Sequence, residues 1–175
     1  MSEPHVPRTF EGSPDRLPPG TRVALAVSRW NEPVTGRLLA GACYRLAAAG
    51  LRPDAIDVAW VPGSFELSFA ADQLAATGRY AAVLCLGAII RGETSHDRHI
   101  AQAAAAGIEG VGRARGLPVL FGVLTCDTLA QALARAAGSE ADGFTGNKGA
   151  ETAAAAVEMI GLVAAIAGVS GSVPA

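Results

Sequence analysis

The amino-acid sequence predicts an α/β protein built on a four-stranded parallel β-sheet with helices on both of its faces. Short apolar runs alternate with longer segments in which apolar residues recur every three or four positions. The first pattern is typical of buried strands and the second of amphipathic helices. Because strands that alternate with helices pair in parallel, the expected order of elements is βαβαβα followed by βαα.

Four apolar runs are the predicted strands, and the third is apolar from end to end, as expected in the centre of a parallel sheet. Pro33 fits the first turn of the first helix, and Gly50 and Gly78 fit the ends of the first and second helices. The expected strands span 22–28, 55–61, 81–90 and 117–125, and the last three helices span about 94–115, 128–138 and 147–168.

The chain divides into a short arm and one domain. Residues 1–20 are rich in proline, glycine and charge, so we expect a flexible or extended N-terminal arm. Residues 21–175 carry all the predicted strands and helices, and this length suits a single domain with one core.

Composition and charge narrow the classes of partner. The chain has 175 residues, 50% of them hydrophobic, and a formal net charge of −2, so no attraction to nucleic acid or to an anionic membrane is expected. The apolar runs 81–90 and 159–169 are shorter than the roughly 20 residues that span a bilayer. A chain this apolar is expected to bury part of its surface in a homo-oligomer.

The cysteines and the N-terminus favour a cytoplasmic location. Cys43, Cys85 and Cys126 are odd in number and form no C-x-x-C pair, which favours free thiols in a reducing compartment. The N-terminus lacks the basic-then-apolar pattern of a secretory signal.

The candidate site lies in the loops that follow the four strands. In a parallel sheet these loops gather beyond the carboxyl ends of the strands, where ligands bind. All four loops are rich in polar or aromatic residues, and they are 28–33 (SRWNEP), 61–67 (VPGSFEL), 90–99 (IRGETSHDRH) and 124–128 (LTCDT).

The loop after the third strand suits an anion. Gly92 permits a tight turn, and Thr94 with Asp97 three residues later is typical of a capping box. Backbone N–H groups at a helix start suit a phosphate, and His96 in the first turn could transfer protons beside it. An ordinary solvated helix start accounts for this motif equally well.

A metal site in the same segment is an alternative. Glu93, His96 and His99 recur every three residues and could share one helical face. However, E-x-x-H-x-x-H is not one of the well-specified zinc patterns, so we favour a site without metal.

Residues of the first two loops could hold a flat ring and a hydroxylated chain. Trp30 could stack on a heterocycle while Asn31 forms directional hydrogen bonds. Ser64 and Glu66, beside Phe65, could bind the hydroxyls of a sugar or polyol. The structural alternatives are Trp30 as a core residue, Ser64 as a helix N-cap and Glu66 as a partner of the helix dipole.

Basic residues near the C-terminus also suit a phosphate. Arg135 precedes a glycine-rich stretch, and Lys148 follows it. The sequence contains neither a Walker-type G-x-x-x-x-G-K-[ST] loop nor a G-x-G-x-x-G motif after the first strand, so nothing supports a bound dinucleotide.

Taken together, five sequence blocks resemble the lumazine synthase family. They occur in the family's order within residues 22–162, and this order is more specific than any single block. The blocks are 28–42 (SRWNEPVTGRLLAGA), 61–75 (VPGSFELSFAADQLA), 86–101 (LGAIIRGETSHDRHIA), 118–136 (PVLFGVLTCDTLAQALARA) and 147–159 (NKGAETAAAAVEM).

The resemblance implies a flavodoxin-like αβα sandwich, assembled at least as a pentamer with active sites between neighbouring subunits. It implies condensation of 5-amino-6-(D-ribitylamino)uracil with 3,4-dihydroxy-2-butanone 4-phosphate to 6,7-dimethyl-8-ribityllumazine, a transferase step of riboflavin biosynthesis. No cofactor or metal takes part in the family. The stretch between Arg135 and Asn147 is longer than in compact members, which favours a pentamer over a sixty-subunit shell.

The resemblance also implies roles for particular residues. His96 corresponds to the acid–base histidine, Arg135 to the phosphate-binding arginine, and Trp30 to the aromatic residue that stacks on the pyrimidine. Phe121 corresponds to an aromatic residue contributed by the adjacent subunit. The other expected substrate-binding residues are Asn31, Ser64 and Glu66 near the ribityl chain, Phe65 beside them, Ala88, Ile89 and Ile90 around the ring, Gly92, Glu93 and Thr94 at the phosphate-binding turn, and Lys148 close to the phosphate.

The residues after His96 depart from the family pattern. The family usually has an aromatic residue, an acid and often a second aromatic, where this chain has Asp97, Arg98 and His99. Two alternatives to the enzyme therefore remain. One is a divergent relative that binds flavin or lumazine with little turnover, and the other is a shell-forming relative without a ligand.

Overall fold

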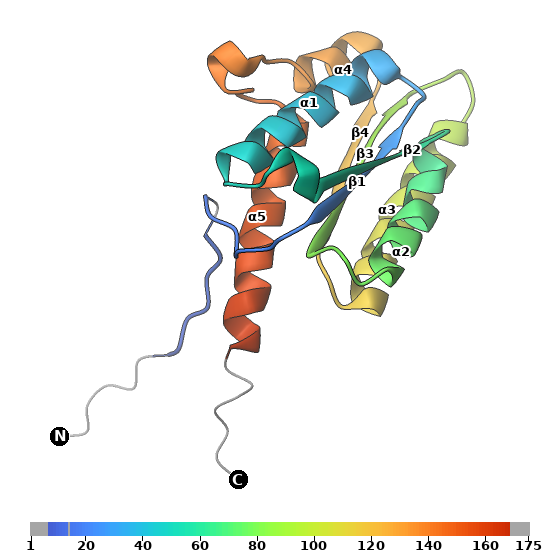
Figure 1. The fold of residues 1–175 in the computed structure, drawn as a ribbon. Coiled ribbons are helices and arrows are strands. Elements are labelled where there is room, and N and C mark those ends of the chain that lie inside the picture. Colours follow the sequence, from blue (N-terminus) through green and yellow to red (C-terminus); the bar gives the residue numbers. More distant parts are fainter. Residues whose placement is uncertain (1–6, 14, 169–175) are drawn as a thin grey trace, which may run out of the picture.

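Four parallel strands form the middle layer of the computed structural model, which describes residues 7–13 and 15–168 (Figure 1). Neighbouring strands pair in parallel throughout the sheet. Val23 pairs with both Ile56 and Ala82, and Val83 pairs with Val119. In spatial order the strands are β2 (Ile56–Val61), β1 (Val23–Ser28), β3 (Ala82–Ile90) and β4 (Val119–Cys126). This order is that of flavodoxin-like sheets, and it confirms the predicted α/β class.

Helices cover both faces of the sheet, as predicted. On one face lie α1 (Glu32–Ala48), α4 (Leu129–Arg135) and α5 (Lys148–Ala167), and on the other lie α2 (Leu67–Ala76) and α3 (His96–Arg115) (Figure 1). Within residues 7–13 and 15–168, three short 3₁₀ helices lie in the loops: η1 (Pro53–Ala55), η2 (Ser64–Glu66) and η3 (Glu140–Asp142).

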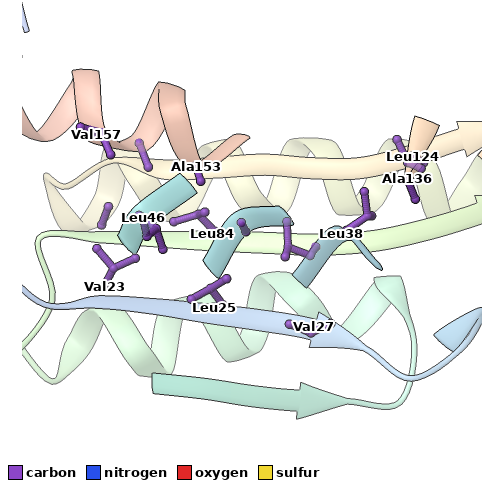
Figure 2. Packing of buried hydrophobic residues seen from close by; sticks show 14 of the residues in the cluster. Val23, Leu25, Val27, Leu38, Leu46, Leu84, Leu124, Ala136, Ala153 and Val157 are labelled. Atoms are coloured by element: carbon purple, nitrogen blue, oxygen red, sulfur yellow. The ribbon is translucent and has the colours of Figure 1, made fainter. Parts of the chain in front are cut away.

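Alternate side chains of the central strands supply two hydrophobic cores. Val23, Leu25 and Val27 of β1 pack with the α1 and α5 side, whereas Ala24 and Ala26 pack with the α2 and α3 side. All five are fully buried. Figure 2 shows the first of these cores between the strands and the helices α1 and α5. A strand covered on both faces must be apolar throughout, which explains the unbroken apolar runs.

Helices α1 and α5 cross closely because glycines face the crossing point. A Cβ on Gly149 would overlap the carbonyl oxygen of Leu38, and a Cβ on Gly41 would overlap the side-chain oxygen of Asn147. The connection between α4 and α5 also packs on α1, where the rings of Tyr44 and Phe144 lie 5.3 Å apart.

Part of the predicted arm lies against the domain. Gly12 approaches α5 so closely that a Cβ would overlap the carbonyl oxygen of Glu158, and Asp15 forms a 2.7 Å ion pair with Arg45 of α1. Residues 7–13 and 15–20 contain no helix or strand. Residues 1–6 of the predicted arm and 169–175 of the predicted domain lie outside the described residues.

Within the described part of the chain, α5 is the one helix long and apolar enough to cross a membrane by length and composition alone. The sequence predicted no such segment, because charged residues interrupt the apolar run. The helix reaches 20 residues by including the alanine-rich turns before that run. Its residues Ala153, Ala156 and Val157 are fully buried in the core beside the sheet, whereas Met159, Val163 and Ile166 of its second half are exposed.

Candidate active site

A cavity of about 490 Å³ lies at the carboxyl edge of the sheet, where the loops after β1, β2 and β3 meet. Its size lies within the range of small-molecule sites. We call this cavity the edge pocket. Its lining residues are Trp30, Asn31, Gly63, Ser64, Phe65, Glu66, Ala88, Ile89, Ile90, Gly92, Thr94, His96, Asp97, His99 and Ile100.

Trp30 lines the edge pocket with most of its side chain uncovered. The residue is 65% exposed, so the alternative of a buried core tryptophan is wrong. The indole lies over Gly63, where a Cβ would approach its Cε3 atom to 3.1 Å. The backbone N–H of Trp30 donates to the carbonyl oxygen of Pro62 at 3.0 Å, which fixes the loop after β1 to the loop after β2. An indole held in this way can stack on a flat ring.

Asn31 links the first loop to the end of β3. Its backbone is left-handed, with φ 62° and ψ 38°, a conformation that asparagine adopts more readily than most residues. Its side-chain Nδ2 donates to the carbonyl oxygen of Ala88 at 2.8 Å. The amide oxygen is the remaining polar atom of this side chain and is suited to accept a hydrogen bond from a ligand.

Ser64 and Glu66 lie in the loop after β2. An oxygen of the Glu66 carboxylate accepts the backbone N–H of Gly63 at 2.9 Å, so this residue stabilises its own turn. Ser64 is 5% exposed, and its hydroxyl lies above Gly87, where a Cβ would approach it to 2.6 Å. Both residues still line the edge pocket, so their structural contacts leave them available to a ligand.

Helix α3 begins at His96, slightly later than predicted. Its N-cap is Ser95, whose side chain makes no capping bond, so the predicted capping box of Thr94 and Asp97 is wrong. Serine is itself a favoured N-cap residue, and it lies one position closer to the helix than Thr94. The Thr94 hydroxyl instead accepts the backbone N–H of His96 at 3.4 Å.

The turn before α3 contributes to the cavity only in part. Gly92 and Thr94 line the edge pocket, whereas Glu93 is not among its lining residues. No three His, Cys, Asp or Glu side chains gather as a possible metal site among the described residues, so Glu93, His96 and His99 do not form one.

Arg135, Lys148 and Phe121 lie in a second cavity along the open edge of the sheet. This β4 pocket has a volume of about 420 Å³, and β4, the end of α4 and the first turns of α5 line it. Phe121 is 45% exposed there. Among the described residues the two cavities share no lining residue, so His96 and Arg135 of one chain do not face a common space.

The charges of the β4 pocket suit an anion. Arg135 is exposed and donates one N–H to the carbonyl oxygen of Gln131 at 3.3 Å, which leaves most of its five donors for a ligand. The Lys148 ammonium pairs with Glu151 at 2.6 Å. Both basic groups are therefore held at the pocket by helical geometry.

The structure adds lining residues that the sequence did not assign to a site. Glu151 lines the β4 pocket, and its i,i+3 spacing from Lys148 on a helix is the signal that could have found it. Asp97, His99 and Ile100 line the edge pocket. The sequence had suggested Asp97 as a capping residue and His99 as a metal ligand, and had assigned neither of them to substrate binding.

The three cysteines are free thiols. Burial raises the pKa of the Cys85 thiol to about 12 and also raises the pKa of Cys43. Both therefore remain protonated near neutral pH, which makes them poor nucleophiles.

The fold and the two cavities define an α/β protein with small-molecule sites at the carboxyl edge and at the open edge of a parallel sheet. The chain belongs to the 6,7-dimethyl-8-ribityllumazine synthase family, whose sequence model matches residues 20–164. Relatives named 6,7-dimethyl-8-ribityllumazine synthase occur in the M12, M23 and Temecula1 strains of Xylella fastidiosa. Each is 44% identical over 154 residues, covering 88% of this chain and 96% of the relative. The resemblance of the five sequence blocks is thus confirmed.

Proposed function

We propose that this chain condenses 5-amino-6-(D-ribitylamino)uracil with 3,4-dihydroxy-2-butanone 4-phosphate, the lumazine synthase reaction of riboflavin biosynthesis. The observation that carries the proposal is the chemistry of the two pockets. The edge pocket offers an exposed indole and a histidine, and the β4 pocket offers an arginine and a lysine. These are the groups that a flat pyrimidine, a proton transfer and a phosphate require.

The edge pocket holds the pyrimidine in this proposal. Trp30 stacks on the ring, and the apolar end of β3 forms the wall around it. Asn31 and Ser64 offer polar atoms to the ribityl chain, with Glu66 and Phe65 beside them. A mostly apolar site with a few placed polar groups is the usual composition of such a pocket.

The phosphate of the butanone substrate is bound in the β4 pocket, where two basic side chains stabilise its negative charge. Arg135 forms two-point hydrogen bonds with phosphate oxygens, and Lys148 supplies a second positive charge. The turn at Gly92 and Thr94 offers backbone N–H groups from the opposite side. Phe121 covers the apolar part of the site.

The two pockets require two protomers. Since one chain keeps His96 and Arg135 in separate cavities, we propose that the edge pocket of one protomer joins the β4 pocket of its neighbour in a closed ring. Phe65 is 57% exposed and Phe69 70% exposed, which is apolar surface that such an interface buries. The long connection between Arg135 and Asn147 favours a homopentamer over a larger shell.

The reaction moves protons at each step, which gives His96 its role. The pyrimidine amine adds to the ketone and water leaves, phosphate is then eliminated, and ring closure releases a second water. His96 carries protons between these positions, while Arg135 holds the departing phosphate. Holding both substrates in one geometry lowers the barrier by up to about 7–11 kcal/mol.

The test is an assay with both substrates, in which formation of the lumazine chromophore is followed. His96→Ala is expected to lower kcat by roughly 10²- to 10⁴-fold, because it removes the acid–base group. Arg135→Ala is expected to raise the KM of the butanone phosphate by roughly 10- to 100-fold, because charged hydrogen bonds to its phosphate are lost.

Arg113→Ala is the matched control, because Arg113 of α3 is 82% exposed and pairs only with Glu109 of its own helix among the described residues. It should leave both constants unchanged. Product formation at the normal rate in both site variants would contradict the site, and absence of product with the unaltered protein would contradict the function. Tight ligand binding without product would instead identify a divergent binding protein.

The proposed location is the cytoplasm. All three cysteines are free, as in proteins of reducing compartments. The reaction as proposed uses no cofactor and no metal.

A further inference from the structure

We infer that Asn147 is a positioning residue, which sets the distance between Arg135 and Lys148 in the phosphate end of the site. The inference rests on the proposed function. Asn147 does not line either pocket, so it acts through its neighbours. Its side chain is completely buried, at 0% exposure, where α1, the end of α4 and the start of α5 meet.

The donor end of Asn147 holds the end of α4. Its Nδ2 lies 2.9 Å from the carbonyl oxygen of Ala136 and 3.0 Å from that of Ala137, the two residues that follow Arg135. The same nitrogen lies 3.2 Å from the carbonyl oxygen of Arg37 in α1. One amide group therefore ties the segment after Arg135 to a helix of the core.

The acceptor end of Asn147 starts α5. Its Oδ1 accepts the backbone N–H groups of Gly149 at 2.9 Å and Ala150 at 3.1 Å. This is an N-cap, and the first residue of the helix that it caps is Lys148. The side chain thus contacts the residue after Arg135 and sets the start of the helix that carries Lys148.

Arg135 needs such an anchor because α4 is short. The helix has 7 residues and Arg135 is its last, at the position where helices fray. Carbonyl groups beyond this end have no partner in a following turn, and the Asn147 amide satisfies two of them. Without it, the guanidinium would sample a wider range of positions and would bind a fixed phosphate less tightly.

Asparagine is required because it both donates and accepts at a site with no spare room. A Cβ on Gly41 would overlap Oδ1 of Asn147, so the amide fits closely against α1. Aspartate keeps the acceptor for the N-cap but turns a second oxygen toward three backbone carbonyls. The Asn147→Asp substitution therefore removes the tie to α4 while it keeps the cap of α5.

The experiment measures the KM of each substrate for the intact assembly of Asn147→Asp. We expect the KM of the butanone phosphate to rise roughly 10-fold, in line with loss of one or two buried hydrogen bonds that hold Arg135. The KM of the pyrimidine should stay within roughly 2-fold, because the edge pocket has no contact with Asn147. Helical content by circular dichroism should be unchanged.

The pH dependence of the KM of Asn147→Asp is a second measurement, and a general loss of stability would not produce the same dependence. A buried carboxyl facing carbonyl oxygens has a raised pKa, and its protonated form donates a hydrogen bond. The ratio of the variant's KM for the butanone phosphate to that of the unaltered protein should therefore fall as the pH is lowered from about 8 to about 6.

Asp57→Asn is the stability control. Asp57 accepts hydrogen bonds from Arg22 and Tyr80, each at 2.8 Å, at the amino end of the sheet, far from both pockets. This variant should lower the melting temperature without changing either KM. Asn147→Ser, which keeps a cap acceptor and lacks the reach of the amide, should reproduce the selective KM change if Asn147→Asp does not fold.

A rise of both KM values together, or an equal change in Asp57→Asn, would overturn the inference and leave Asn147 a general structural residue. An unchanged KM for the butanone phosphate would overturn it as well. These outcomes differ from failure of the proposed function, which is the absence of product with the unaltered protein.

Discussion

Several pocket side chains hold backbone groups of their own loops before any ligand binds. Asn31 donates to the carbonyl oxygen of Ala88 at 2.8 Å, and Glu66 accepts the N–H of Gly63 at 2.9 Å. Each bond joins a loop to a strand end or closes a turn. The cavity is consequently shaped in the unliganded chain, which reduces the ordering that a substrate has to bring about.

At the residue scale, Trp30 gives a direct test of stacking. Trp30→Ala is expected to raise the KM of the pyrimidine substrate by roughly 10-fold or more, since stacking of a base on an aromatic ring is worth about 1–3 kcal/mol. Trp30→Phe should recover most of this loss, because a ring remains. Both variants should melt close to the unaltered protein, because Trp30 is 65% exposed.

Steady-state kinetics with each substrate varied in turn, and thermal unfolding, are the two measurements. If Trp30→Ala leaves the pyrimidine KM unchanged, the ring binds elsewhere. A KM change of equal size for the butanone phosphate would show a loss of the whole site rather than of stacking.

The sequence could predict which residues share a pocket only where those residues lie close together along the chain. Gly92, Thr94 and His96 lie in one short turn, and the structure places all three at the edge pocket. The capping pair within that turn was wrong, because α3 begins at His96 and Ser95, not Thr94, occupies the N-cap position. Glu151 was missed although the predicted helix 147–168 already placed it three residues after Lys148. Its position at the β4 pocket depends on how α5 packs beside β4 and the end of α4, which local spacing does not record.

At the scale of elements, the close crossing of α1 and α5 depends on glycine. Gly149→Ala is expected to destabilise the protein by about 1–3 kcal/mol, since the added methyl group overlaps the backbone of Leu38. Gly36→Ala is the matched control, because no atom lies within 4 Å of a Cβ at this position of α1. The control should stabilise the helix by about 0.4–1 kcal/mol.

Urea unfolding with an unchanged m-value measures both effects. Equal changes in the free energy of unfolding for the two variants would mean that helix propensity, and not the crossing, determines the cost at Gly149.

The elements themselves could be predicted, but their arrangement could not be worked out from local patterns. A strand such as β3 shows itself by its unbroken apolar run, because burial on both faces acts on each residue in turn. The order β2-β1-β3-β4 depends on which distant strands pair with each other, and the spacing of apolar residues within each segment does not predict that pairing. Only the resemblance to a family gave the flavodoxin-like order in advance.

At the scale of the whole molecule, His96 and Arg135 of one chain lie in separate cavities. Mixing subunits that lack one or the other residue therefore tests whether each active site is shared by two protomers. In a ring of identical protomers, His96→Ala and Arg135→Ala subunits mixed in equal amounts give roughly a quarter of intact sites, because each site draws one residue from each neighbour. Activity should recover to roughly a quarter of that of the unaltered protein when the two variants are refolded together.

Each variant refolded alone is the control. With the butanone phosphate well below the KM of the unaltered protein, each should keep roughly a tenth of the unaltered activity or less. Mixed rings that form without any recovery of activity would place both residues in a site within one protomer, contrary to the proposal.

The tie between Asn147 and Arg37 joins positions 110 residues apart. During synthesis, the apolar side chains of α1 and of the sheet that pack against α5 stay uncovered until the C-terminal segment leaves the ribosome. Contacts of such long range form late and slowly. A truncation just before residue 147 removes α5 and leaves these apolar side chains exposed, so the shortened chain should be found in inclusion bodies.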